Sequence, residues 1–142
     1  MKILKNETIQ VFLSRRGPDH FEKMTFEHEF EQDSAHFTLL SSVLQLRGCF
    51  VCNQPVKHES SESVLQWNGQ IFRGLQNTPQ HRSDTEELME ELNDTNNDQE
   101  ILSVLSSIHG PWAFSYWDNK AKKLWIGRDV LGRRSLCWNV NK

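Results

Sequence analysis

The cysteines are the side chains of this sequence best suited to act as a nucleophile or as soft metal ligands. Cys49 and Cys52 form a Cys-x-x-Cys pair, and Cys137 stands alone near the end of the sequence. A structural zinc site would require a second pair of cysteine or histidine ligands at matching spacing. Only His58 is nearby, and in a strand the two thiols of the pair would point to opposite faces. We therefore predict structural thiols and no metal site.

The sequence contains none of the common motifs of catalytic loops. Gly-x-Ser-x-Gly, Gly-x-x-x-x-Gly-Lys and Gly-x-Gly-x-x-Gly, the signatures of a serine nucleophile and of phosphate-binding loops, are all absent. What is unusual is a set of turn-forming segments: Arg16-Gly17-Pro18, Trp67-Asn68-Gly69, an acidic helix start at Asp84, and two Gly-Arg pairs within 127–134. These segments are more specialised than a simple chain reversal requires.

Strands are predicted on either side of the first two turns. The segment 21–33 favours a strand, with a poorly ordered loop as the alternative, and the segment 36–49 predicts a strand pair with Gly48 as the break. The segment 63–72 predicts strand, tight turn and strand, because Asn68-Gly69 is a strong hairpin signal.

Two helices are predicted in the middle of the chain. The first starts at Ser83 or Asp84, with a glutamate three residues on as in a capping box. The second covers 98–110, where apolar residues recur at helical spacing and Gly110 can end the helix.

The last third of the chain predicts a β-hairpin around the polar turn 118–121. The side chains expected to point inward are Trp112, Phe114, Tyr116, Leu124 and Ile126. The segment 132–140 is expected to begin a further strand. Strands at both ends with two helices between them indicate a layered α/β or α+β domain.

Length and composition fit one globular domain. The 142 residues are 37% hydrophobic and 25% charged, with a formal net charge of −3, so a nucleic-acid partner is not expected. The sequence lacks a long apolar run and the pattern of a signal peptide, so we expect no membrane association. A small, odd number of cysteines suits a reducing compartment, and the expected location is cytoplasmic.

Charge is segregated along the chain. The segment 84–100 carries eight acidic and no basic side chains, whereas 111–142 carries seven basic and two acidic ones. This pattern indicates a solvated helix face beside a basic hairpin, with a pair of partner-binding patches as the alternative.

Five segments, in this order, resemble the glutaminase domain of class II glutamine amidotransferases, the N-terminal-nucleophile type found in asparagine synthetase. They are SRRGPDH from Ser14, LQWNGQIF from Leu65, SDTEELM from Ser83, HGPWAFSYWD from His109 and LWIGRDVLGRRSLCW from Leu124. The chain is most similar to the asparagine synthetase domain-containing subfamily. The resemblance implies that residues 1–142 are a partial amidotransferase domain, without the synthetase domain.

The resemblance also implies a fold and a site. The fold is an α+β, four-layer αββα sandwich of two sheets between helices. The Asn68 side-chain amide and the Gly69 N–H match the oxyanion hole, which stabilises negative charge on the glutamine amide oxygen. A hairpin turn at Asn-Gly is the structural alternative, and both can hold at once. Asp84 matches the carboxylate that receives the substrate's α-ammonium group, with a plain helix N-cap as the alternative.

Several positions depart from the family pattern. The family nucleophile is a cysteine exposed as the first residue after removal of methionine, but Lys2 stands there, and the first cysteine is Cys49. Leu44 stands where the arginine for the glutamine carboxylate is expected, and Arg47 is the candidate replacement. The family's first strand, most of its first helix and its last strands have no room in the sequence. We therefore expect an incomplete sandwich.

The implied activity is the glutaminase part of a glutamine-hydrolysing asparagine synthase, acting on L-glutamine in asparagine biosynthesis without a cofactor. The implied partner is an asparagine synthetase-like domain, in cis or in trans. Because no cysteine of the chain carries an α-amino group, we expect the chain to be inactive by itself. The alternatives are a non-catalytic amino-acid- or protein-binding module that keeps the rim of the pocket, and an unstable fragment with an exposed sheet edge.

Overall fold

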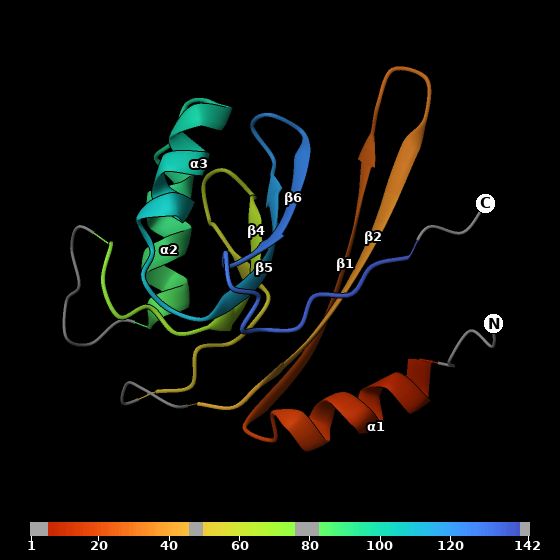
Figure 1. The fold of residues 1–142 in the computed structure, drawn as a ribbon. Coiled ribbons are helices and arrows are strands. Elements are labelled where there is room, and N and C mark those ends of the chain that lie inside the picture. The colour runs from red at the N-terminus through yellow and green to blue at the C-terminus, as the bar shows by residue number, and fades with distance from the viewer. Residues whose placement is uncertain (1–5, 46–49, 76–82, 140–142) are drawn as a thin grey trace. The chain divides into compact units, whose positions relative to one another are not determined.

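The computed structural model describes residues 6–45, 50–75 and 83–139. Contacts group the chain into two units, Met1–Pro55 and Val56–Lys142. The described residues form three helices and six strands in two antiparallel sheets (Figure 1). The mixed content of helices and antiparallel sheets fits the expected α+β class. Within the described ranges, no helix is long and apolar enough to cross a membrane.

The first unit consists of a helix and a long hairpin. The helix α1 (Asn6–Arg16) is followed by the strands β1 (His20–Glu29) and β2 (Ser34–Val43). The two strands pair antiparallel over their whole length, and the rings of Phe26 and Phe37 stack across them with centroids 4.7 Å apart. Aromatic pairs of this kind stabilise a two-stranded sheet, which by itself is marginal in water.

The strand expected in 21–33 is confirmed, but the strand pair expected in 36–49 is wrong. Residues 34–43 form one strand, and its partner is β1. The tight turn between the strands, closed by the hydrogen bond from Phe30 N–H to Asp33 O at 2.7 Å, lets β1 fold directly back onto β2. The expected break at Gly48 lies outside the described residues.

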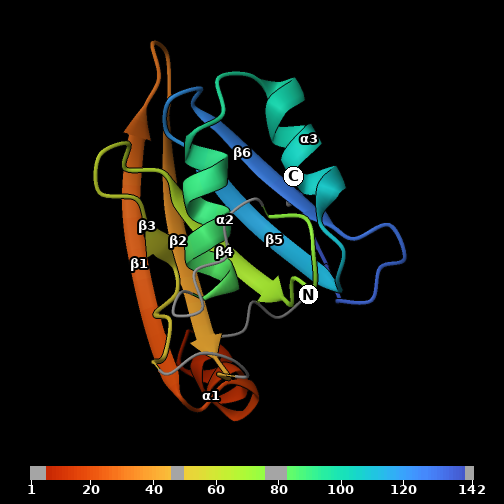
Figure 2. The same ribbon diagram turned by 90° about the vertical axis from the view of Figure 1, so that its left-hand side faces the viewer.

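The second unit is built on a four-stranded antiparallel sheet. Its strands are β3 (Val56–Lys57), β4 (Val64–Gly69), β5 (Trp112–Asp118) and β6 (Lys123–Arg128), and they lie side by side in that order. The chain leaves the sheet after β4, forms two helices and returns as β5. Figure 2 shows both helices lying across one face of this sheet.

Both helices begin at capping residues. α2 (Asp84–Asn93) has Ser83 as its N-cap, and the hydroxyl of Ser83 accepts a hydrogen bond from Glu86 N–H while the Glu86 carboxylate accepts one from Ser83 N–H. α3 (Asp98–Ser107) follows the N-cap Asn97. Caps of this kind satisfy N–H groups that a helix start leaves without partners, which explains why the helices begin where they do. Both predicted helices are confirmed, but the expected end at Gly110 is wrong, because α3 ends at Ser107 with the extended residue Ile108 as its C-cap.

The core of the second unit lies between the helices and the sheet. Burial of each large apolar side chain there contributes about 1.5–3 kcal/mol. Strand residues in this core are Leu65, Trp67, Trp112, Phe114 and Tyr116; helix and loop residues are Ile71, Leu88, Met89, Leu92, Ile101, Leu105 and Ile108.

The predicted β5–β6 hairpin is confirmed, and three of its expected inward residues are buried: Trp112, Phe114 and Tyr116. The expectation for Leu124 and Ile126 is wrong, because 46% and 53% of these residues stay exposed. The register explains the difference. Trp125 stands opposite Tyr116 and packs against the core, so its neighbours Leu124 and Ile126 lie on the other face of the sheet.

The strand expected from residue 132 is also wrong for the part of that segment that the structure describes. Residues 132–139 form no strand. Gly132 has a φ of +64° and its N–H donates to Asp129 O at 2.8 Å, so the chain turns sharply after β6 instead of extending.

Candidate functional site

The residues predicted for the oxyanion hole lie at the end of β4. Gly69 stands opposite Trp112 of β5, and the next residue, Gln70, donates its N–H to Pro111 O at 3.0 Å. The hairpin predicted at Asn68-Gly69 is therefore wrong, since pairing with β5 continues straight through both residues and neither has a positive φ. Hydrogen bonds along β5 outweigh the local preference of Asn-Gly for a turn.

The pairing also fixes the direction of the Gly69 N–H. In an antiparallel ladder, the N–H groups of successive residues point alternately to the two neighbouring strands. Because the Gln70 N–H points to β5, the Gly69 N–H points to the β3 side. β3 pairs with β4 only at Val64 and Leu65, so among the described residues no ladder partner stands opposite this donor.

The side chain of Asn68 lies on the sheet face away from the helices. Leu65 and Trp67 point into the core on the helix side, and Asn68 alternates with them. Asn68 is exposed, and its amide hydrogen-bonds to no other described residue. The side-chain amide of Asn68, on one face of the sheet, and the backbone N–H of Gly69, in the plane of the sheet, thus belong to successive residues at the end of β4, and neither has an internal partner in the described chain.

Asp84 lies close to this point. It is the first residue of α2 and not the N-cap, which is Ser83, so the N-cap alternative for Asp84 is wrong. Asp84 Oδ2 accepts a hydrogen bond from Ile71 N–H at 2.6 Å. This bond ties the start of α2 to the chain just after Asn68-Gly69. The helix dipole favours a carboxylate at this position.

The structure ties Asp84 to Ile71, two residues beyond Gly69, whereas the Asn68 side chain lies on the opposite face of the sheet, and it does not place Arg47. Arg47 lies outside the described residues. Leu44 follows β2 in the first unit and is 53% exposed.

The cysteines form no cluster within the described ranges. Cys49 lies outside them, Cys52 is half-buried and Cys137 is exposed. The Cys52 thiol donates to Asn53 O at 3.7 Å. In the described part of the chain, no three histidine, cysteine, aspartate or glutamate side chains are placed to hold a metal ion.

A buried acidic group beside the candidate site was not assigned by sequence reasoning. Asp129 is only 5% exposed, and its carboxylate accepts four hydrogen bonds at 3.1 Å, from the N–H groups of Trp112, Leu131 and Arg133 and from Arg133 Nε. Arg133 Nη2 donates in turn to Gly110 O. The available signal was the aspartate–arginine pair at i, i+4 in a glycine-containing turn. Three of the four donors to Asp129, however, are backbone N–H groups, and the acceptor for Arg133 Nη2 is a backbone carbonyl, and no sequence pattern identifies such atoms.

The contacts of Asp129 keep its carboxylate ionised. Burial alone would raise the pKa of the Asp129 carboxyl. Hydrogen bonds from Trp112 and Arg133, together with the positive charge of Arg133, outweigh burial and hold this pKa below its ordinary value. Asp129 is therefore a fixed negative charge and not a proton donor near neutral pH.

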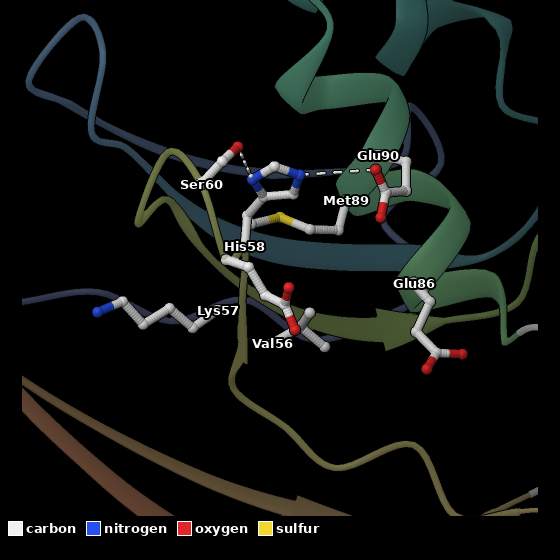
Figure 3. Close-up of a pocket in the computed structure, with 8 residues that line it drawn as sticks. Val56, Lys57, His58, Ser60, Glu86, Met89 and Glu90 are labelled. Carbon is white, nitrogen blue, oxygen red and sulfur yellow. Dashed lines mark hydrogen bonds and ion pairs between the residues drawn. The ribbon is translucent and has the colours of Figure 1, made fainter.

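A pocket of about 410 Å³ lies between the β3–β4 turn and α2 (Figure 3). His58 is its central side chain: Nδ1 accepts from Ser61 N–H at 3.3 Å, and Nε2 lies 3.5 Å from Glu90 Oε2. A backbone N–H can only donate, so the lone pair of Nδ1 is already engaged and Nε2 carries the proton. The hydroxyls of Ser60 and Ser61 also lie near Nδ1, at 3.3 and 3.1 Å, so neither serine is singled out as its partner. The pocket lining includes none of the predicted site residues.

The acidic and basic segments of the chain meet in the second unit. Lys123 Nζ lies 2.6 Å from Asp98 Oδ2, and Lys120 Nζ donates to Asn93 O. The basic hairpin thus neutralises part of the acidic helical segment directly. These contacts favour the prediction of a solvated helix beside a basic hairpin.

Comparison with known proteins identifies the family. A family model described as a glutamine amidotransferase domain matches residues 4–142. Asparagine synthetase domain-containing protein 1 is 38% identical over 130 residues in Homo sapiens and 37% over 131 in Bos taurus, covering 91% of this chain and 19% of each relative. The Gallus gallus protein of the same name is 33% identical over 136 residues, covering 96% of this chain and 21% of its own length.

The chain spans about a fifth of the length of these relatives. No solved structure matches the chain significantly. The family model covers nearly the whole chain, and the identities with these relatives exceed 30% over almost the same residues. This chain therefore belongs to the glutamine amidotransferase domain family.

Proposed function

We propose that the chain binds L-glutamine at the end of β4, as part of a class II glutamine amidotransferase. The observation that carries the proposal is the 2.6 Å hydrogen bond from Ile71 N–H to Asp84 Oδ2. It holds a carboxylate two residues beyond the Gly69 N–H; this N–H and the neighbouring Asn68 amide lack an internal partner among the described residues. A carboxylate, which can bind a cation, and two neutral hydrogen-bond donors near the end of β4 suit a ligand that carries both an ammonium group and an amide carbonyl.

In this proposal each group has a separate task. Asp84 receives the α-ammonium group of glutamine through a charge-assisted hydrogen bond. Asn68 and Gly69 donate to the amide oxygen, which gains negative charge when a nucleophile attacks the amide carbon. Removal of one donor of this kind typically lowers the catalytic rate constant of an amide-hydrolysing enzyme by about 10²–10³-fold. We further propose Arg47 for the α-carboxylate of the ligand.

The released nitrogen would serve a second domain. We propose that ammonia from glutamine passes to an asparagine synthetase-like domain, in cis or in trans, for asparagine biosynthesis. The names of the relatives and their greater length support this proposal. We also propose that the sheet β3–β6 is one of the two sheets of a four-layer αββα sandwich. The half-exposed Leu124 and Ile126, on the face away from the helices, are suited to cover by a second sheet.

Binding is tested by calorimetry with the purified 142-residue chain, using glutamine with glutamate as the comparison ligand. Asp84→Asn keeps an acceptor for Ile71 N–H and removes only the charge, so we expect the fold to persist and glutamine binding to be lost. Asp98→Asn is the matched control, because Asp98 occupies the same first position of α3. Equal binding by both variants would exclude Asp84 from the site. Absence of binding by the wild type at millimolar glutamine would exclude the proposed function.

Hydrolysis is a separate arm of the test. In the purified polypeptide of residues 1–142, Lys2 follows Met1 and no cysteine has a free α-amino group, so we propose that this polypeptide releases no ammonia from glutamine by itself. Binding without ammonia release supports this proposal, and it is also what a non-catalytic binding module would give. Turnover by the purified chain, lost on substitution of one of its cysteines, would contradict it.

A further inference from the structure

We propose that Asp129 and Arg133 position the Gly69 N–H through the backbone of Gly110–Trp112. They are positioning residues for the amide-binding site, and this part of their role rests on the proposed function. A series of contacts connects Asp129 with the end of β4.

The first step is the clamp on the segment before β5. The Asp129 carboxylate accepts from Trp112 N–H at 3.1 Å, and Asp129 N–H donates to Trp112 O at 2.9 Å. Arg133, fixed by its own bond from Nε to Asp129 Oδ1, donates through Nη2 to Gly110 O. The clamp therefore holds Gly110–Trp112 at both ends.

The second step is the close approach of this segment to β4. Gln70 N–H donates to Pro111 O at 3.0 Å. A Cβ on Gly110 would lie only 1.8 Å from Gln70 O, and a Cβ on Gly69 would lie 2.6 Å from Pro111 O. Backbones packed this closely move together, because no side chain lies between them to absorb a shift. The position of Gly110–Trp112 therefore sets the position of Gly69 and Gln70.

The third step is the direction of the Gly69 N–H. It points to the β3 side of β4 because Gln70 N–H is held by Pro111 O on the β5 side. Loosening the clamp allows the start of β5 to shift against β4. The peptide between Asn68 and Gly69, which carries this N–H and lies opposite Ala113 and Trp112, then turns away from its present direction. A hydrogen bond to the amide oxygen weakens steeply when the N–H no longer points at that oxygen. A rotated Gly69 N–H therefore loses most of its ability to stabilise negative charge there.

Asp118 provides a matched control at the opposite end of β5. It is also a buried aspartate, 7% exposed, and its carboxylate accepts from Lys120 N–H at 2.9 Å and Ala121 N–H at 3.1 Å. Asp118→Asn thus removes a buried aspartate charge from the other end of the β5–β6 hairpin without touching Gly110–Trp112. A role in general stability would make Asp118→Asn and Asp129→Asn equivalent.

The experiment compares the wild-type chain with Asp129→Asn and Asp118→Asn by ¹H–¹⁵N spectra and by glutamine calorimetry. We expect Asp129→Asn to shift the amide resonances of Gly69 and Gln70 and to weaken glutamine binding up to about tenfold, the upper end of what one hydrogen bond between neutral groups contributes. Asp118→Asn should shift the resonances of Lys120 and Ala121 and leave glutamine affinity within about twofold at comparable thermal stability.

Unchanged Gly69 and Gln70 resonances in Asp129→Asn, or equal changes in both variants, would overturn the inference. Should Asp129→Asn fail to fold, Arg133→Ala replaces it. That variant keeps the carboxylate, removes the bond to Gly110 O, and is expected to shift the same two resonances by a smaller amount. A wild-type chain that binds no glutamine would refute the proposed function, whereas the resonances would still decide whether Asp129 positions Gly69.

Discussion

The two ends of the β4–β5 strand pair use the same residue types in opposite ways. At the end where β5 turns into β6, Asn119 is fully engaged: its amide donates to Ser61 O at 2.8 Å and accepts from Trp117 Nε1 at 3.2 Å. At the other end, the Asn68 amide is exposed and has no hydrogen-bond partner in the described chain. We call these the closed end and the open end.

Each end also contains one buried aspartate, and the two aspartates differ in how far away in sequence their hydrogen-bond partners lie. Asp118 at the closed end accepts from residues two and three positions ahead, so it stabilises only its own turn. Asp129 at the open end bonds to Trp112, which lies 17 residues away in sequence. The open end is thus stabilised by a residue distant in sequence, Asp129, which bonds to its backbone. The Asn68 amide and the Gly69 N–H are not needed for this stabilisation and stay available to a ligand.

The largest effect is expected from Gly110→Ala at the open end. Its Cβ would lie 1.8 Å from Gln70 O, and neither backbone segment can move apart without losing hydrogen bonds. We expect the free energy of unfolding to fall by about 3 kcal/mol, at the upper end of overpacking costs. Chemical denaturation measures it. Gly127→Ala is the control, because the added Cβ would meet only the edge of the Phe114 ring, at 2.8 Å, and ring atoms move more easily. Equal losses would show that the open end is no more tightly packed than the strands.

Asn119→Ala should have the next largest effect. It removes the partners of Trp117 Nε1 and Ser61 O, which are partly buried, and leaves them unsatisfied. We expect a loss of about 2 kcal/mol in the free energy of unfolding, with no change in glutamine affinity. Thermal unfolding and calorimetry check the two parts. A loss of glutamine binding would show that the two ends are coupled, and it would contradict the separation of a structural closed end from a ligand-binding open end.

Acid should weaken the open end through Asp129. Its pKa is lowered in the folded state, so its contribution to stability is fully present above the ordinary aspartate pKa of about 3.9 and is lost as pH falls through the lower, folded-state pKa. We expect the melting temperature of the wild type to fall more steeply below about pH 4 than that of Asp129→Asn. Parallel curves for the two proteins would contradict the ionised clamp.

Asn68→Ala should have the smallest effect on stability. The side chain is exposed, so we expect a change within about 0.5 kcal/mol in the free energy of unfolding, together with loss of glutamine binding. It is the matched counterpart of Asn119→Ala, since the same side chain is removed from the other end. A destabilisation as large as that of Asn119→Ala would show that Asn68 has a structural role.

The sequence predicted the elements whose signals are local. The capping box at Ser83 and the periodic apolar residues of α2 and α3 define both helices, and the β5–β6 hairpin follows from its polar turn. Asn68-Gly69 was misjudged because a local turn preference lost to ladder pairing with a strand more than forty residues later. Leu124 and Ile126 were misjudged because the KLWI run of β6 lacks clear alternation, and only the register with β5 decides which face is buried.

For the candidate site, Asn68, Gly69 and Asp84 came from the resemblance, and the structure adds how they are held. The bond between Ile71 and Asp84 and the clamp by Asp129 are side-chain contacts to backbone N–H groups, 13 and 17 residues apart. Backbone N–H groups are the same in nearly every residue, so sequence patterns carry no record of such contacts. Arg47 stays a prediction, because it lies outside the described residues.

The hydrogen bond between Ile71 N–H and Asp84 has an entropic consequence. A free aspartate side chain would have to give up rotational freedom when it captured an ammonium group, at a cost of about 0.5–1.5 kcal/mol. In the proposed site Asp84 is already held by the 2.6 Å bond, so that loss of freedom would occur during folding and not during binding. A small ligand, which can form few contacts, gains most from such preorganisation, because the free energy of each contact goes directly into affinity.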